Sequence, residues 1–116
     1  MENNQKILNE IKTISNIFEN GKYLESISKA KKLLHKLPQN EFLINITGMS
    51  YLKLGYLEDA KNLYLKMIKN KPSIISFKNN YANVLKSLQR NKEAEQILEQ
   101  IIEIQPNYIN AINNLA

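Results

Sequence analysis

Residues 41–74 read EFLINITGMSYLKLGYLEDAKNLYLKMIKNKPSI, and this stretch decides the fold. Its apolar residues recur at steps of three and four over 41–54 and again over 57–70, which is the spacing of amphipathic helices. Gly55 separates the two runs, where a tight turn after a helix favours a residue that accepts positive φ. Pro72 ends the second run because its ring cannot continue a helix. The stretch therefore predicts two helices joined by a short turn.

The same pattern returns every 34 residues along the chain. Pro38, Pro72 and Pro106 are the only prolines, and they lie 34 residues apart. Other columns with this spacing are Ser26, Ala60 and Ala94; Glu25, Asp59 and Glu93; Leu33, Met67 and Ile101; and Gly48, Ala82 and Ala116. The small residues in these columns predict places where two helices approach closely. Because one helix pair cannot bury its own apolar face, several pairs must stack on one another.

The predicted fold class is all-α, and strand signals are absent from the sequence. We expect first helices near 5–19, 41–54, 75–88 and 108–116, and second helices near 23–36, 57–70 and 91–104. The turns between them fall at Gly21 and Gly55. Gln89 takes the corresponding place in the third unit, so the turn there is less strongly signalled.

This pattern resembles the tetratricopeptide repeat family, whose unit is a 34-residue helix-turn-helix. The clearest unit, 41–74, has the favoured residue types at Gly48, Tyr51, Gly55, Ala60, Tyr64 and Pro72. The resemblance implies one domain over 1–116, a right-handed superhelical array of antiparallel helix pairs. Its repeats would be about 7–40, 41–74 and 75–108, with a partial fourth over 109–116. In the divergent first unit, Ile14 stands where the family favours a small residue and Ser26 where it favours alanine.

Composition and charge point to a chain that folds in a reducing compartment. There is no cysteine, so disulfides and thiolate metal sites are excluded. Neither a leader pattern nor a membrane span is signalled, and we expect a cytoplasmic protein. The net charge of +5 comes from seven Lys against four Glu in residues 1–40 and five against three acidic residues in 41–74, whereas 75–116 is balanced. We expect the basic run Lys29, Lys31, Lys32 and Lys36 to spread over more than one helix face, which makes nucleic acid an unlikely partner.

Signals of catalysis are nearly absent, and we expect that the chain is not an enzyme and takes no cofactor or metal. His35 is the single histidine, and we expect it to be an ordinary surface or groove residue, because the sequence places no catalytic partner beside it. The acidic column Glu25, Asp59 and Glu93 falls near the start of each second helix, where a carboxylate interacts favourably with the helix dipole. Neither a phosphate-binding glycine loop nor zinc-ligand spacing occurs.

A column of asparagines is the candidate binding site. Asn45, Asn79 and Asn113 lie 34 residues apart, with Asn80 and Asn114 beside the latter two and Asn83 one turn further along. The resemblance implies that first helices line a concave face, so these amides would form a ladder that grips a peptide backbone. The same surface would carry Met49, Phe42, Leu52 and Lys86. Family members that clamp a carboxylate use several basic groove residues, but the positions here are Ile11, Ser15, Asn45, Asn79 and Asn83, so that activity is not expected.

Three functions remain open from the sequence. The leading hypothesis is a protein-interaction module that holds a peptide or partner segment in the concave groove. A second is the N-terminal substrate-docking region of a larger enzyme, such as a transferase, because apolar residues at the C-terminal end lack a polar cap: Tyr108, Ile109, Ile112 and Leu115. That end could also support self-association. The third is a basic helical repeat that binds nucleic acid.

Overall fold

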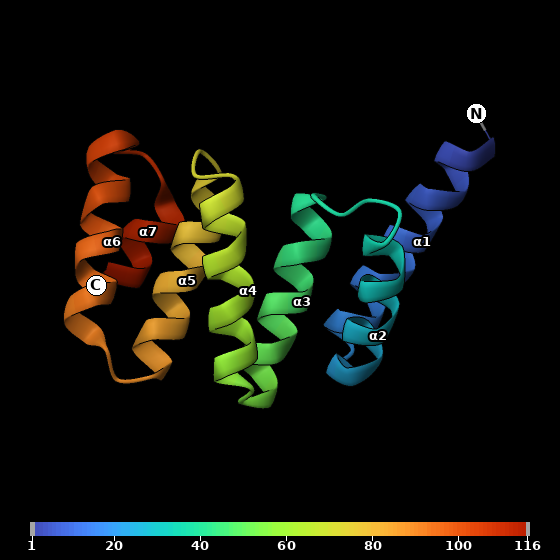
Figure 1. Ribbon diagram of the computed structural model, residues 1–116, viewed down its shortest axis with the longest axis horizontal. Helices are drawn as coiled ribbons and strands as arrows, with labels where there is room; N and C mark the ends of the chain where they lie inside the picture. The colour runs from blue at the N-terminus through green and yellow to red at the C-terminus, as the bar shows by residue number, and fades with distance from the viewer. Residues whose placement is uncertain (1, 116) are drawn as a thin grey trace. The chain divides into compact units, whose positions relative to one another are not determined.

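The computed structural model describes the backbone of residues 2–115 and the side chains of residues 4–115. Over that range it contains helices and no strand, as predicted (Figure 1). The helices are α1 (Glu2–Glu19), α2 (Tyr23–Leu34), α3 (Glu41–Leu54), α4 (Leu57–Asn70), α5 (Ile75–Ser87), α6 (Asn91–Ile104) and α7 (Ile109–Leu115). No helix in this part of the chain is both long enough and apolar enough to cross a membrane.

The observed helix ends differ from the predicted ones by at most three residues. The largest difference is at α1, which begins at Glu2 rather than near residue 5. Helix α2 ends at Leu34, two residues early, because the next amide groups bond to nearer carbonyls: His35 N to Lys32 O at 3.3 Å and Lys36 N to Leu33 O at 3.0 Å. Such tightening of the last turn satisfies carbonyls that the helix leaves unpaired before Pro38.

The chain divides into two compact units, an N-terminal unit over Met1–Gly55 and a C-terminal unit over Tyr56–Ala116. The boundary between the two units, after Gly55, does not coincide with a predicted repeat boundary. The repeat 41–74 contributes α3 to one unit and α4 to the other. The reason is visible inside each unit, where a second helix packs on the first helix of the next repeat: α2 on α3, α4 on α5, and α6 on α7. Stacking between repeats therefore holds each unit together as much as pairing within a repeat does.

The N-terminal unit is built from α1, α2 and α3 around one apolar cluster. Its fully buried members are Ile14, Ala30, Leu33, Leu43 and Ile46. Ile14, which stands where a small residue was expected, is only 2% exposed and contributes its whole side chain to this cluster. Ile14, the residue that departs from the family pattern, is therefore part of the core.

The C-terminal unit is built from α4 to α7, and α5 lies in contact with the other three. The largest fully buried side chains here are Tyr64, Phe77, Leu85, Leu98 and Ile101. The rings of Tyr64 on α4 and Phe77 on α5 lie 6.4 Å apart, within the range of favourable aromatic pairs. Aromatic contact of this kind joins the second helix of one repeat to the first helix of the next.

The predicted column of small residues marks tight helix packing. Ser26, Ala60 and Ala94 are all 0% exposed in the second helices α2, α4 and α6. The serine is compatible with full burial because its hydroxyl donates a hydrogen bond to the Lys22 carbonyl at 2.9 Å. The burial of all three is thus consistent with the hypothesis that small side chains set the distance between packed helices.

The turns within the repeats share one backbone geometry. Gly21 and Gly55 have φ of 78° and 80°, and Gln89 has φ of 64°. At the first and third turns, the amide of the next residue donates a hydrogen bond to the carbonyl five residues earlier. These bonds are Lys22 N to Ile17 O and Arg90 N to Leu85 O. Gln89 therefore adopts the left-handed conformation that glycine adopts elsewhere, as its place in the repeat predicted.

We predict that Gln89→Gly raises the free energy of unfolding by roughly 0.5–1 kcal/mol, because glycine accepts positive φ without the steric cost that a Cβ brings. The measurement is urea unfolding followed by circular dichroism. Gln89→Ala is the matched control: it keeps the Cβ and should give no gain. A loss of stability in Gln89→Gly would contradict the assignment of strain to this turn.

Candidate functional site

The predicted ladder residue Asn79 lies between α5 and α7. Its side chain is only 4% exposed, and its Oδ1 accepts a hydrogen bond from Nδ2 of Asn114 at 3.0 Å. On the next turns of α5, Lys86 donates from Nζ to the backbone carbonyl of Asn114. Asn79 therefore contributes to helix packing, and its amide already has a partner within the chain.

Asn80, the neighbouring predicted site residue, is directed to a different helix. Its side chain is hydrogen-bonded to Tyr64 of α4. Burial raises the pKa of the Tyr64 hydroxyl, and the hydrogen bond to Asn80 partly opposes this effect. Successive residues of a helix point about 100° apart, so the adjacent amides of Asn79 and Asn80 contact different helices, α7 and α4.

The remaining predicted residues of the C-terminal unit are more accessible than Asn79. Asn83 on α5 is half-buried, whereas Lys86 on α5 and Asn113 on α7 are exposed. Helices α5 and α7 are in contact, so the first helices of the third and fourth repeats are neighbours, as the family resemblance implied. We call Asn83, Lys86 and Asn113 the first-helix polar surface.

In the N-terminal unit, Asn45 and Met49 lie on α3, and both are half-buried. Helix α3 contacts α1, which is again a pair of first helices. The structure thus leaves the asparagine ladder in two separately described parts, and its continuation from Asn45 to Asn79 stays a prediction.

The sequence interpretation placed Asn114 beside the asparagine column but did not predict its hydrogen bond to Asn79. The 34-residue column selected Asn113, which is exposed, but the hydrogen bond to Asn79 comes from the next residue. The available signal was the pair Asn113-Asn114, which repeats the pair Asn79-Asn80 one unit earlier. Only the orientation of α7 shows which amide of the pair faces the neighbouring helix.

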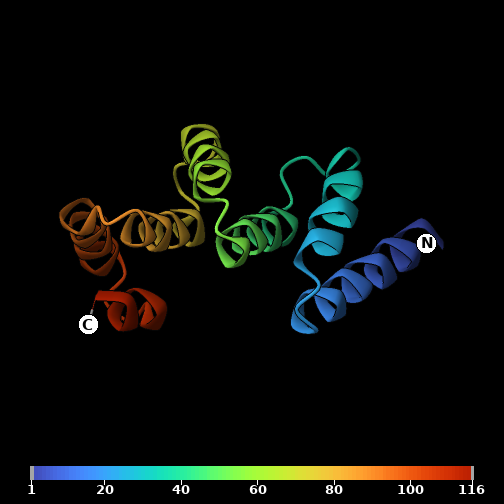
Figure 2. The ribbon, with the colours of Figure 1, turned by 90° about the horizontal axis from the view of Figure 1, so that it is seen from below.

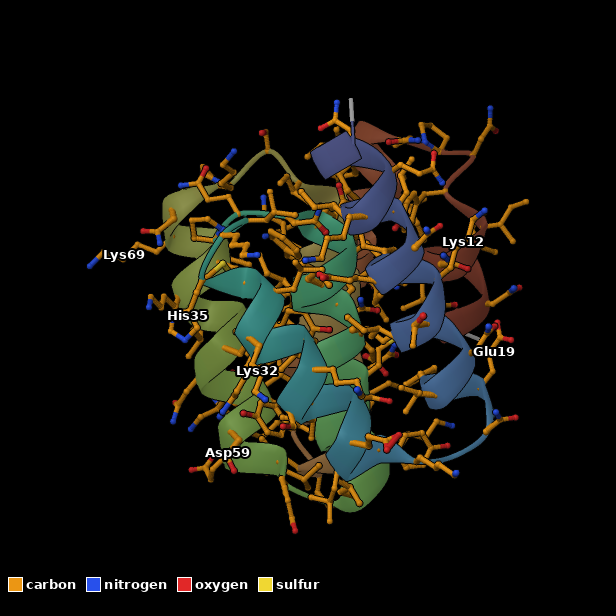
Figure 3. All side chains as sticks on the ribbon, turned by 90° about the vertical axis from the view of Figure 1, so that its right-hand side faces the viewer. Lys12, Glu19, Lys32, His35, Asp59 and Lys69 are labelled. Carbon is orange, nitrogen blue, oxygen red and sulfur yellow. The ribbon has the colours of Figure 1, made fainter. Side chains whose placement is uncertain are left out.

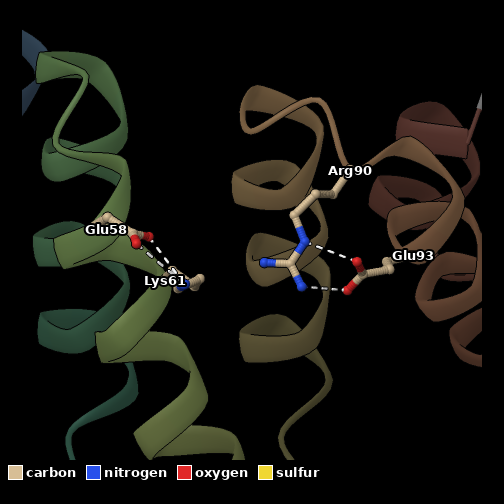
Figure 4. Close-up of polar contacts among 4 residues, drawn as sticks. All are labelled: Glu58, Lys61, Arg90 and Glu93. Atoms are coloured by element: carbon tan, nitrogen blue, oxygen red, sulfur yellow. Dashed lines mark hydrogen bonds and ion pairs between the residues drawn. The ribbon is translucent and has the colours of Figure 1, made fainter.

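The acidic column lies in the first turns of the second helices, as predicted: Glu25 in α2, Asp59 in α4 and Glu93 in α6. Glu93 also accepts two hydrogen bonds from the Arg90 guanidinium, at 2.8 and 2.7 Å (Figure 4). These bonds lower the pKa of the Glu93 carboxyl and raise that of Arg90. The pair is exposed and therefore has the character of a surface ion pair. Separately, the Glu93 carboxylate in the first turn of α6 interacts favourably with the helix dipole.

Among the described residues, no group of three or more histidine and acidic side chains could hold a metal ion. His35, which the sequence predicted to be an ordinary surface or groove residue, is exposed just after α2.

We predict that Asn114→Ala lowers the free energy of unfolding by about 1 kcal/mol, because the buried Oδ1 of Asn79 loses its donor. The measurement is urea unfolding of the intact chain. Asn113→Ala is the matched control, since it makes the same change on the same helix at an exposed position. Equal losses in the two variants would show that the Asn79–Asn114 bond has no specific role.

Comparison with known proteins identifies the repeats. The tetratricopeptide repeat family model matches residues 46–74 and 75–108, which together make up more than half of the chain. The human protein O-mannosyl-transferase TMTC2 is 30% identical over 91 residues, which cover 76% of this chain. The chain spans only 11% of the length of that transferase.

Solved structures show the same fold. The first tetratricopeptide domain of Spaghetti (RPAP3), bound to the HSP90 peptide SRMEEVD, is similar with a TM-score of 0.81 and 25% identity, over 96% of this chain and 88% of that one. An O-GlcNAc transferase from Thermobaculum terrenum gives a TM-score of 0.83 at 20% identity, over 99% of this chain and 22% of the transferase. With the family model matched over most of two repeats and the helix pairs in place, the chain belongs to the tetratricopeptide repeat family.

Proposed function

We propose that this chain is a protein-interaction module that binds a peptide or an extended partner segment along its first helices. The observation that carries the proposal is the similarity, over nearly the whole chain, to a tetratricopeptide domain that was solved with a peptide bound. Tetratricopeptide repeats are a protein-interaction fold, and the matched repeats include α4, α5 and α6 entirely.

The first-helix polar surface supplies the polar contacts in this proposal. Asn83 and Asn113 each carry an amide that can donate to and accept from a peptide backbone, and Lys86 adds a cation. Asn79 and Asn80 would act indirectly, because their amides are engaged with Asn114 and Tyr64. In the N-terminal unit, Asn45 and Met49 on α3 would supply contacts of their own, with Met49 as an adaptable apolar group.

The proposal assigns the repeats no catalytic step, cofactor or metal, and it places them in the cytoplasm. Self-association through the C-terminal end also remains a prediction. Its basis is the exposure of Ile109 and Ile112, at 67% and 43%, on α7. Apolar side chains of this kind favour association when they form a contiguous patch.

The direct test uses peptides selected from a random library on the immobilised chain, with affinity measured by fluorescence polarisation. We predict that Asn83→Ala/Asn113→Ala binds a selected peptide roughly tenfold more weakly, since each amide contributes about one hydrogen bond to the peptide backbone. Asn62→Ala/Gln96→Ala is the matched control, because both residues are exposed on the second helices α4 and α6. Unchanged affinity in the first variant, with unchanged circular dichroism, would refute binding at this surface.

A second candidate function is substrate docking within a larger transferase. It is favoured by the 30% identity to protein O-mannosyl-transferase TMTC2, of which the chain matches a small part. Reading the gene on both sides of the codons for residues 1–116 shows whether a catalytic domain is encoded in the same chain.

If a transferase domain is present, we expect deletion of residues 1–116 to lower kcat/KM for a protein acceptor by roughly tenfold or more and to spare transfer to a short acceptor. Remote binding energy is available only to the larger substrate. Initial rates with both acceptors provide the measurement. Equal losses for the two acceptors would mean that the repeats stabilise the enzyme and do not dock its substrate.

A further inference from the structure

A deep basic groove lies between α1 and α2 in the N-terminal unit. The two helices meet at the Gly21 turn and separate toward the start of α1 and the end of α2 (Figure 2). The space between them has a volume of about 720 Å³, which is within the roughly 300–1,000 Å³ typical of ligand pockets. It is lined by Gln5, Lys6, Asn9, Glu10, Thr13 and Ile14 of α1 and by Lys29, Lys32, Leu33 and Lys36 on the α2 side.

Four lysines line this groove: Lys6 of α1 and three of the four lysines in the predicted basic run. Lys29, Lys32 and Lys36 are spaced by three and four residues and so share one face, opposite Lys6 of α1. Only Lys31 of the basic run faces elsewhere, with Nζ lying 5.4 Å from the centre of the Tyr51 ring. The basic run thus occupies more than one face, as predicted, but the sequence did not show that three of its lysines share a groove with Lys6.

The positive charge of the groove is largely uncompensated. All four groove lysines are exposed, and within the described residues none of them forms an ion pair. Among the residues whose side chains are described, Glu10 is the one acidic residue that lines the groove. Like charges three and four residues apart on a helix repel each other, so a ligand with negative charge would relieve a cost that the free protein carries.

The floor of the groove is apolar and its α1 wall is polar. Ile14 and Leu33 close the floor, at 2% and 4% exposure, and the aliphatic stems of the lysines extend this apolar surface. On the wall, Gln5 donates to the Asn9 Oδ1 at 3.2 Å and Thr13 donates to the Asn9 carbonyl at 2.9 Å. The groove thus combines a small apolar floor with lysine side chains on both sides.

We propose that this groove is a second docking site, separate from the first-helix polar surface, for an acidic peptide segment of a partner protein. One apolar side chain of the segment would rest on Ile14 and Leu33, and flanking carboxylates would pair with Lys6, Lys29, Lys32 and Lys36. A peptide fits these features better than nucleic acid does. Glu10 would repel phosphates, and a duplex is too broad to reach the apolar floor.

The test uses a labelled peptide of sequence EEELEEE, acetylated and amidated so that it has no terminal charges, and measures binding by fluorescence polarisation at low salt. We expect Lys29→Gln/Lys32→Gln/Lys36→Gln to bind it at least tenfold more weakly. The control variant is Lys12→Gln/Lys66→Gln/Lys69→Gln, which removes the same charge from exposed lysines that do not line the groove. Figure 3 shows Lys12 on the side of α1 turned away from α2, and Lys69 on α4.

Three results would overturn the proposal. The first is an equal loss in the control variant, which would mean attraction by net charge alone. The second is equal binding of EEEGEEE, which lacks the apolar side chain. The third is binding of a mixed-sequence DNA duplex with the same affinity and the same dependence on the groove lysines, which would assign the groove to nucleic acid.

Two further measurements separate this site from the proposed function and from misfolding. Thermal unfolding of the groove variant should be unchanged or improved, because the substitutions remove repulsion between lysines. The variant Asn83→Ala/Asn113→Ala should still bind EEELEEE with unchanged affinity, and the groove variant should still bind the library-selected peptide. Loss of both ligands in either variant would show that the two sites are not separate, and the proposal of a second site would fall.

Discussion

Burial of apolar helix faces between consecutive repeats is the interaction on which the rest of the structure depends. A single pair such as α1 and α2 leaves Ile14 and Leu33 without enough cover, and α3 completes the cluster through Leu43 and Ile46. The same logic recurs in the C-terminal unit, where Tyr64 of α4 lies against Phe77 of α5. Small residues such as Ala60 allow the helices to approach closely enough for this contact. The helix pairs therefore stack because no single pair can bury its own apolar surface.

This packing also decides which polar residues are available to a partner. Asn79, Asn80 and Asn83 fall within little more than one turn of α5, yet they have three different environments. The first is buried against α7 and the second is bonded to α4, so both stabilise the arrangement of helices. Asn83 alone keeps a half-exposed amide without a demonstrated helix-packing role. The binding surface that we propose on the first helices is thus held in place by two neighbouring asparagines, Asn79 and Asn80, whose amides contact other helices.

Charge shows a related division between the two units. In the C-terminal unit the Arg90–Glu93 and Lys61–Glu58 pairs neutralise each other at the starts of α6 and α4 (Figure 4). In the N-terminal unit the groove lysines have no such partners among the described residues, and they surround an apolar floor. The two units thus differ in how the charges on their surfaces are compensated.

The sequence by itself determined the helices, the turns and the repeat, because these depend on local patterns. Pro72 and Pro106 closely follow the ends of α4 and α6, where the ring cannot continue a helix. The turn at Gln89 was less strongly signalled than the glycine turns, yet it has the same left-handed backbone. Only the tertiary structure decided how side chains are shared between helices. It placed Asn79 against Asn114 rather than in an open ladder, and it directed Lys29, Lys32 and Lys36 into one groove with Lys6. Such contacts depend on the orientation of a neighbouring helix, which a periodic pattern within one helix does not specify.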